Sequence, residues 1–121
     1  MALAEVKTVF ASAARTATPT AVTLDVNRYE ELALFIDCTV DPAAASVLVT
    51  VSQINPVSGT KTDLLVANAL ASVSQQVLYI GPSIVASANV AANAVLGTRL
   101  EIKAVHADGD SITYSVTAVL R

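Results

Sequence analysis

The residues best suited to chemistry lie close together near the carboxyl end of the chain. His106, Asp108 and Asp110 alternate around Gly109. A calcium loop of the EF-hand type needs about six or seven oxygen ligands and a Glu at its twelfth position, but counting from Asp108 that position is a valine. A zinc site needs three or four ligands, and the chain has one His and one Cys. Asp side chains cap turns and Gly accepts a positive φ, so we interpret the segment as a turn and expect no metal.

Two further groups could support catalysis. Cys38 is a potential nucleophile, but it is in phase with Leu34 and Ile36 on an alternating segment, which predicts a buried apolar role. Glu30 and Glu31 are adjacent, and neighbouring residues of a strand point to opposite faces, so they would not share a proton. We interpret them as a solvated strand edge that discourages unwanted pairing.

The sequence carries none of the common catalytic or cofactor motifs. It has no Gly-rich phosphate loop, no dinucleotide-binding fingerprint and no Gly-x-Ser-x-Gly elbow. Aromatic platforms for sugar stacking are scarce as well, with no Trp, two Phe and three Tyr. We therefore expect no enzymatic activity and no cofactor.

The elements that position these residues are strands. From residue 112 to 120, alternate residues are apolar, and the segment 99–106 alternates in the same way. The short polar segment between them has turn chemistry. We predict a hairpin. The inward-facing residues would be Leu100, Ile102, Ala104, Ile112, Tyr114, Val116, Ala118 and Leu120.

Strands are also predicted over residues 21–26, 31–40, 46–54, 62–68 and 72–80. The segments 46–54 and 62–68 flank a Pro/Gly/Ser loop of hairpin length, and the last strand stops at Gly81 and Pro82. Phe35 lies on the second face of its strand, which suggests that the strand is covered on both sides. The fold class expected is all-β, an antiparallel β-sandwich or barrel-like domain with a C-terminal hairpin.

Two segments are ambiguous. Residues 1–20 are an N-terminal arm reaching to a neighbour or a first strand, and residues 21–121 are expected to be a single β-sandwich domain. Residues 83–97 carry no charge and are predicted to form a loop or a short helix, and we favour the loop. These segments supply the candidate assembly contacts: Val6, Val9, Phe10, Ile84, Val85, Val90 and Val95.

Charge is scarce throughout the chain. Charged residues make up 14%, against about 25% in ordinary soluble domains. The net charge is −3 with no Lys/Arg cluster, which disfavours nucleic-acid binding. No apolar run has the roughly 18–20 residues of a membrane span, and the first residues make a poor signal peptide. Because 54% of residues are apolar, we expect neighbouring subunits to cover part of the surface.

The sequence resembles small virion-associated proteins of tailed bacteriophages. These often end in a run of the form T-x-R-V-x-V-x-H-x-D-x-x-x-I-T-Y-S-V, and residues 98–116 read TRLEIKAVHADGDSITYSV. The text YIGP at 79–82 and RTATPTAVTLDV at 15–26 are also similar to that group. The match departs at Leu100, where an aromatic residue is common, and at Ile80, which separates Tyr79 from Gly81.

The resemblance implies a structural component of the virion, made in the host cytoplasm. Our leading hypothesis is a head decoration or cement protein that binds across capsomer junctions, with the major capsid protein or other virion subunits as partners and a homo-oligomer, a trimer by preference. The alternatives are a neck or tail protein, such as a tail-tube or completion protein, and a host- or glycan-binding adhesion domain displayed on the particle. The resemblance transfers no catalytic residues.

Overall fold

The computed structural model describes residues 4–121, which form nine strands and no helix. Among these described residues there is accordingly no helix with the length and apolar character to cross a membrane. The strands are β1 (Glu5–Arg15), β2 (Val22–Asp25), β3 (Leu32–Val40), β4 (Val47–Ile54), β5 (Lys61–Val66), β6 (Ser74–Gly81), β7 (Ala91–Asn93), β8 (Arg99–His106) and β9 (Ile112–Leu120).

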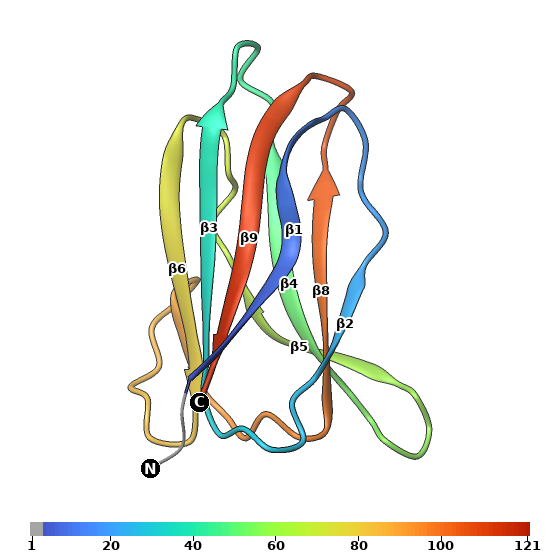
Figure 1. Ribbon diagram of the computed structural model, residues 1–121, viewed down its shortest axis with the longest axis vertical. Helices are drawn as coiled ribbons and strands as arrows, with labels where there is room; N and C mark the ends of the chain where they lie inside the picture. Colours follow the sequence, from blue (N-terminus) through green and yellow to red (C-terminus); the bar gives the residue numbers. More distant parts are fainter. Residues whose placement is uncertain (1–3) are drawn as a thin grey trace.

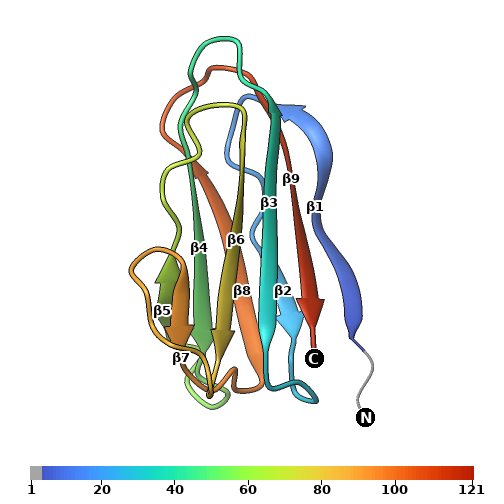
Figure 2. The same ribbon diagram turned by 90° about the vertical axis from the view of Figure 1, so that its left-hand side faces the viewer.

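The strands form two sheets that pack face to face (Figures 1 and 2). One sheet has the order β1-β9-β3-β6-β7, and the other has the order β2-β8-β4-β5. Neighbouring strands are antiparallel except β6 and β7, which are parallel. The prediction of an antiparallel β-sandwich is confirmed.

The core lies between the sheets and follows the alternation of the sequence. Every second residue of β9, from Ile112 to Leu120, is fully buried, and so are Leu100, Ile102 and Ala104 of β8. Side chains of a strand point alternately to opposite faces, so an alternating apolar strand buries one face against the other sheet. The inward-facing residues predicted for both strands are confirmed.

The predicted C-terminal hairpin is wrong. β8 pairs with β2 and β4, whereas β9 pairs with β1 and β3, so residues 107–111 cross from one sheet to the other. In the sequence, a hairpin and a connection between two sheets look alike, because both join two alternating strands through a short polar segment. Each strand finds its partners far away in the sequence, which the local pattern does not specify.

The predicted hairpin between residues 46–54 and 62–68 is confirmed as β4 and β5. Its loop closes through Asn55, whose side-chain oxygen accepts hydrogen bonds from the backbone N–H groups of Val57 and Ser58 at 2.9 and 3.1 Å. Gly59 in this loop has a φ of 77°, a conformation that costs Gly little.

Strand β1 contains the first of the predicted contact segments. It pairs with β9 from Glu5 to Arg15, and its register shifts between Thr8 and Phe10. A bulge of this kind inserts an extra residue, and here consecutive residues Val9 and Phe10 are both buried, at 7% and 5% exposed. Their side chains belong to the core, so they leave the set of candidate assembly contacts.

Residues 82–98 contain no helix. They form turns and the short strand β7, in agreement with the favoured loop interpretation. Backbone hydrogen bonds from Tyr79 N to Val90 O (2.9 Å) and from Ala94 N to Gly81 O (3.1 Å) attach the loop to β6. The side chain of Gln53 on β4 donates to Val95 O at 2.9 Å.

Candidate functional site

His106, Asp108 and Asp110 do not converge on a common point in the structure. Asp108 Oδ1 accepts a hydrogen bond from the backbone N–H of Asp110 at 3.1 Å, the local contact of a turn. His106 Nε2 instead lies 2.9 Å from the hydroxyl of Tyr114. In the part of the chain that the structure describes, no three His, Cys, Asp or Glu residues form a group that could hold a metal ion.

His106 and Tyr114 belong to a structural cluster with Arg15. The guanidinium of Arg15 lies 4.7 Å from the centre of the Tyr114 ring and donates to the carbonyl of Tyr114 at 2.8 Å. The backbone N–H of His106 donates to Thr18 Oγ1 at 2.9 Å. This cluster fastens the end of β1 and the segment after it to the sandwich. Burial lowers the pKa of His106, and the Arg15 charge lowers it further, although Asp108 acts in the opposite direction.

This lowered pKa predicts that acid destabilises the protein through His106. The unfolded chain takes up a proton near the ordinary His value of 6.5, whereas the folded chain resists it, so the unfolded state binds more protons below that pH. The free energy of unfolding should be at its full value above pH 6.5 and fall as the pH drops through the lower, folded-state pKa. Urea unfolding at several pH values measures it.

The matched control for this prediction is His106→Asn, which lacks a group that titrates in this range. Subtracting its pH profile from that of the parent chain removes the contribution of the carboxylates. If the two profiles run parallel between pH 7 and pH 5, His106 does not have a lowered pKa.

Cys38 is buried as predicted, in phase with Leu34 and Ile36. Burial raises the pKa of its thiol, and the charge of Asp41 raises it further. Because the thiolate is the nucleophile, this environment holds the sulfur in its unreactive form. Its Sγ faces the carbonyl of Val40 at 3.8 Å.

Glu31 does not form the strand edge predicted for it. β3 is the central strand of its sheet, with β9 on one side and β6 on the other. The Glu31 carboxylate forms an ion pair with Arg121, and the backbones of these two residues exchange hydrogen bonds of 2.9 and 3.0 Å. The carboxylate therefore closes the end of the sheet beside the chain terminus.

The surface with the most unusual composition is the outward side of the five-stranded sheet. Strand pairing aligns its residues in rows, and the row beside Phe35 toward the end of β3 carries the charged Asp37 with Ser115 and Gln75. We call the two other rows across β1, β9, β3 and β6 the outer face; they consist of Val6, Val119, Ala33 and Tyr79 in one and Thr8, Thr117, Phe35 and Val77 in the next. Neither row contains a charged residue.

The outer face exposes large apolar side chains. Val6 is 67% exposed, Phe35 43% and Tyr79 44%. The sequence suggested that the strand of Phe35 is covered on both sides, but within one chain the second side is open. Monomeric soluble proteins rarely expose large contiguous apolar patches, so this surface is the candidate functional site.

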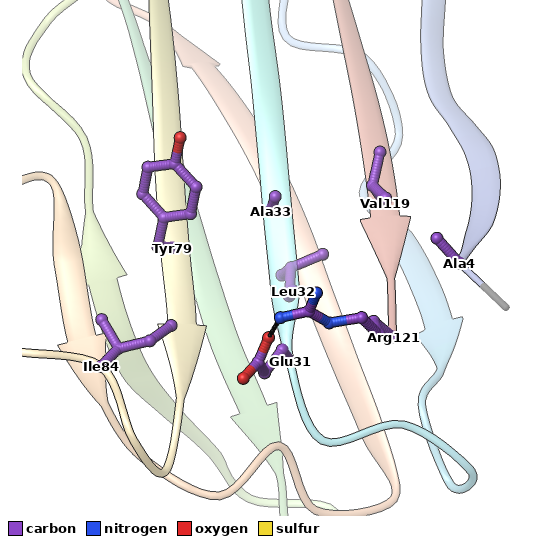
Figure 3. A pocket seen from close by; sticks show the side chains of 8 residues that line it. All are labelled: Ala4, Glu31, Leu32, Ala33, Tyr79, Ile84, Val119 and Arg121. Atoms are coloured by element: carbon purple, nitrogen blue, oxygen red, sulfur yellow. Dashed lines mark hydrogen bonds and ion pairs between the residues drawn. The ribbon is translucent and has the colours of Figure 1, made fainter. Parts of the chain in front are cut away.

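An open hollow of about 260 Å³ lies on the outer face beside Tyr79. Figure 3 shows Tyr79, Ala33 and Val119 presented side by side from β6, β3 and β9, with the Glu31–Arg121 pair at the lower end. Ile84 completes the wall next to Tyr79. The volume is below the roughly 300–1,000 Å³ of pockets that enclose small molecules.

The outward side of the four-stranded sheet is different. There Glu101 Oε2 lies 2.6 Å from Lys61 Nζ, and Ser52 donates to Asp63 at 2.7 Å. Charged and hydrogen-bonded groups pair with each other on this side, although Leu48 and Val105 are also exposed there, at 38% and 45%. The outer face differs in that neither of its two rows carries a charged residue.

The structure places the predicted contact residues in three environments. Val6 lies on the outer face and Ile84 at its hollow, whereas Val9 and Phe10 are buried in the core. The loop residues are exposed, namely Val85, Val90 and Val95. Sequence reasoning missed Tyr79, Val77 and Val119, because their grouping depends on which strands pair. The alternation of the sequence placed Phe35 on the second face of its strand, but we expected that face to be covered, whereas it is exposed.

Comparison with known proteins gives a likeness of fold. No protein-family model matches the chain, and no curated protein sequence matches it. The chain is similar in structure to the SPBc2 prophage-derived protein YomS, with a TM-score of 0.58 and 12% identity over 100% of this chain and 97% of that one. A chain of infectious bursal disease virus, Gx strain, gives a TM-score of 0.47 with 14% identity over 98% of this chain and 31% of that one, a likeness too weak to carry an argument. The protein thus has the fold of a prophage-derived protein over its whole length.

Proposed function

We propose that the chain is a structural protein of a bacteriophage virion, and more specifically a head decoration or cement protein. It binds across capsomer junctions through the outer face, with the major capsid protein or other virion subunits as partners. The observation that carries the proposal is the uncharged outer face, with Phe35 and Tyr79 exposed on a folded chain. The fold shared with a prophage-derived protein and the ITYSV-type C-terminal strand agree with a phage origin.

The composition of the outer face suits a protein interface. The buried centres of interfaces are depleted of charge and enriched in aromatic residues, and a few aromatic anchors supply most of the binding energy. Here Phe35 and Tyr79 are the anchors, and the Ala and Thr residues between them allow close approach. Repetition over a closed shell raises the effective concentration of partners, so each contact can be modest. The proposal assigns no reaction, metal or cofactor to the chain.

The test is binding of the purified chain to phage particles assembled without it. Phe35→Asp places a charge among the anchors and should reduce occupancy on the particle at least about tenfold, as loss of a hot-spot residue does. The matched control is Val105→Asp, at a residue that is 45% exposed on β8 of the other sheet. It adds the same charge and should leave occupancy unchanged.

Electron microscopy of the decorated particles gives the location. Density over capsomer junctions on the head supports the decoration role, whereas density confined to the neck or tail, or binding to host polysaccharide in place of particles, contradicts it. Equal occupancy for Phe35→Asp and Val105→Asp would exclude the outer face as the binding surface.

A further inference from the structure

Strand β1 is the longest open edge of the sandwich. The other edge strands are β7, β2 and β5, with three, four and six residues, whereas β1 has eleven. Figure 2 shows β1 at the margin of its sheet, on the side of β9 away from β3. An edge strand presents unpaired backbone N–H and C=O groups that can pair with another strand.

The two halves of β1 differ in how this edge is treated. In the second half the Arg15 guanidinium donates to the carbonyls of Ala11 and Ala13, and the strand is bulged. The bulge disrupts the regular ladder of this half and Arg15 occupies two of its carbonyls, so this half is unsuited to pairing with another strand. The first half, Glu5–Thr8, is regular in its pairing with β9, and the carbonyls of β1 that accept from Arg15 belong to the second half.

The charged residues of the first half, Glu5 and Lys7, would complement those of a second copy of the same segment. Glu5 and Lys7 are two residues apart, so they point to the same face of the strand, and Lys7 Nζ lies 3.8 Å from Glu5 Oε1. Val6 stands between them on the opposite, outer face. If two such segments run antiparallel with Val6 opposite Val6, each Glu5 lies opposite Lys7 of the other copy. Directly opposed unlike charges stabilise an antiparallel pair, and like charges destabilise it.

We propose that a second copy of this chain pairs with the Glu5–Thr8 edge of β1, antiparallel and about a twofold axis at Val6. The axis is perpendicular to the sheet, because the two strands present the same face on the same side. The two five-stranded sheets then form one continuous ten-stranded sheet. In it, one row of the outer face is aligned with the same row of the second copy, namely Val6, Val119, Ala33 and Tyr79. The outer face doubles in extent, and Val6, which is 67% exposed, gains Val6 of the second copy as a lateral neighbour at the centre.

This pairing is a different arrangement from the trimer expected from the sequence, and it does not depend on the proposed virion role. It is tested in solution without particles, by sedimentation equilibrium over a concentration series. The parent chain should form a dimer. Glu5→Lys alone and Lys7→Glu alone each oppose like charges at two symmetry-related positions, and each should weaken the dimer about tenfold or more.

The double variant Glu5→Lys with Lys7→Glu restores unlike pairs and should return the dimer to near the parent affinity. Mixing the two single variants should give a heterodimer, because one carries two positive and the other two negative side chains at these positions. The control for net charge is Lys103→Glu on β8, which should leave the dimer intact. Circular dichroism checks that each variant keeps its strands.

Three outcomes would overturn the pairing. They are a parent chain that is monomeric or trimeric at every concentration, single variants that dimerise as well as the parent, and a double variant that stays as weak as the singles. None of these outcomes affects the particle-binding experiment on Phe35, so the dimer and the proposed function are tested independently.

Discussion

Replacement of Tyr114 by alanine is expected to lower the free energy of unfolding by about 3–5 kcal/mol, the range for truncation of a large buried aromatic residue. Tyr114 is fully buried and is the largest such side chain in the core. Alanine would leave a cavity between the sheets, and it would remove the hydroxyl that meets His106 Nε2 and the ring that faces Arg15. Urea unfolding followed by circular dichroism measures the loss.

Tyr114→Phe separates these contributions. It keeps the ring and its contact with Arg15 but removes the hydroxyl, so the expected loss is only about 1 kcal/mol, the net value of one hydrogen bond. A loss for Tyr114→Ala no greater than that for Tyr114→Phe would contradict the assignment of this side chain to the packed core.

Lys61→Met is expected to cost about 1–3 kcal/mol because it leaves the Glu101 carboxylate without its partner. Glu101 has only 9% of its side chain exposed, and its Oε2 lies 2.6 Å from Lys61 Nζ. A buried charge that loses its partner pays the cost of its lost hydration. Lys61 is itself half exposed, and solvent screening of that end keeps the cost below that of a fully enclosed pair.

The control for this prediction is a double-mutant cycle with Glu101→Gln. The neutral amide needs no cation, so Lys61→Met should cost less in the Glu101→Gln background than in the parent. Lys103→Met on the same strand as Glu101 serves as a comparison for the loss of a lysine alone. If Lys61→Met costs no more than Lys103→Met, the ion pair contributes nothing measurable.

The local pattern of the sequence was sufficient for the strands and for which of their faces is buried. In β9 the residues from Ile112 to Leu120 alternate so regularly that only one face could enter a core, and the structure buries it. The burial of Cys38 followed from its phase with Leu34 and Ile36 in the same way. The turn chemistry of Asp108 and Asp110 was likewise a local property, because an Asp side chain bonds to its own backbone two residues further on.

Errors arose where the result depends on a distant partner. The segment around Gly109 joins strands of different sheets, because β8 and β9 find their neighbours far along the chain. Val9 and Phe10 alternate as one outward and one inward residue in a regular strand, and only the bulge against β9 sends both inward. The ion pair of Glu31 with Arg121 spans 90 residues and leaves no local signal.

By itself the sequence determined an all-β chain, the phase of each strand and a surface too poor in charge to be evenly polar. The strands and their phase follow from the period of two that neighbouring residues reveal, and the scarcity of charge follows from composition. The tertiary structure decided which strands are neighbours, and so gathered Val6, Ala33, Phe35, Tyr79 and Val119 from four strands onto one face. Strand order and register are set by packing between residues far apart in the chain, so the outer face and the open edge of β1 exist only once the sandwich has formed.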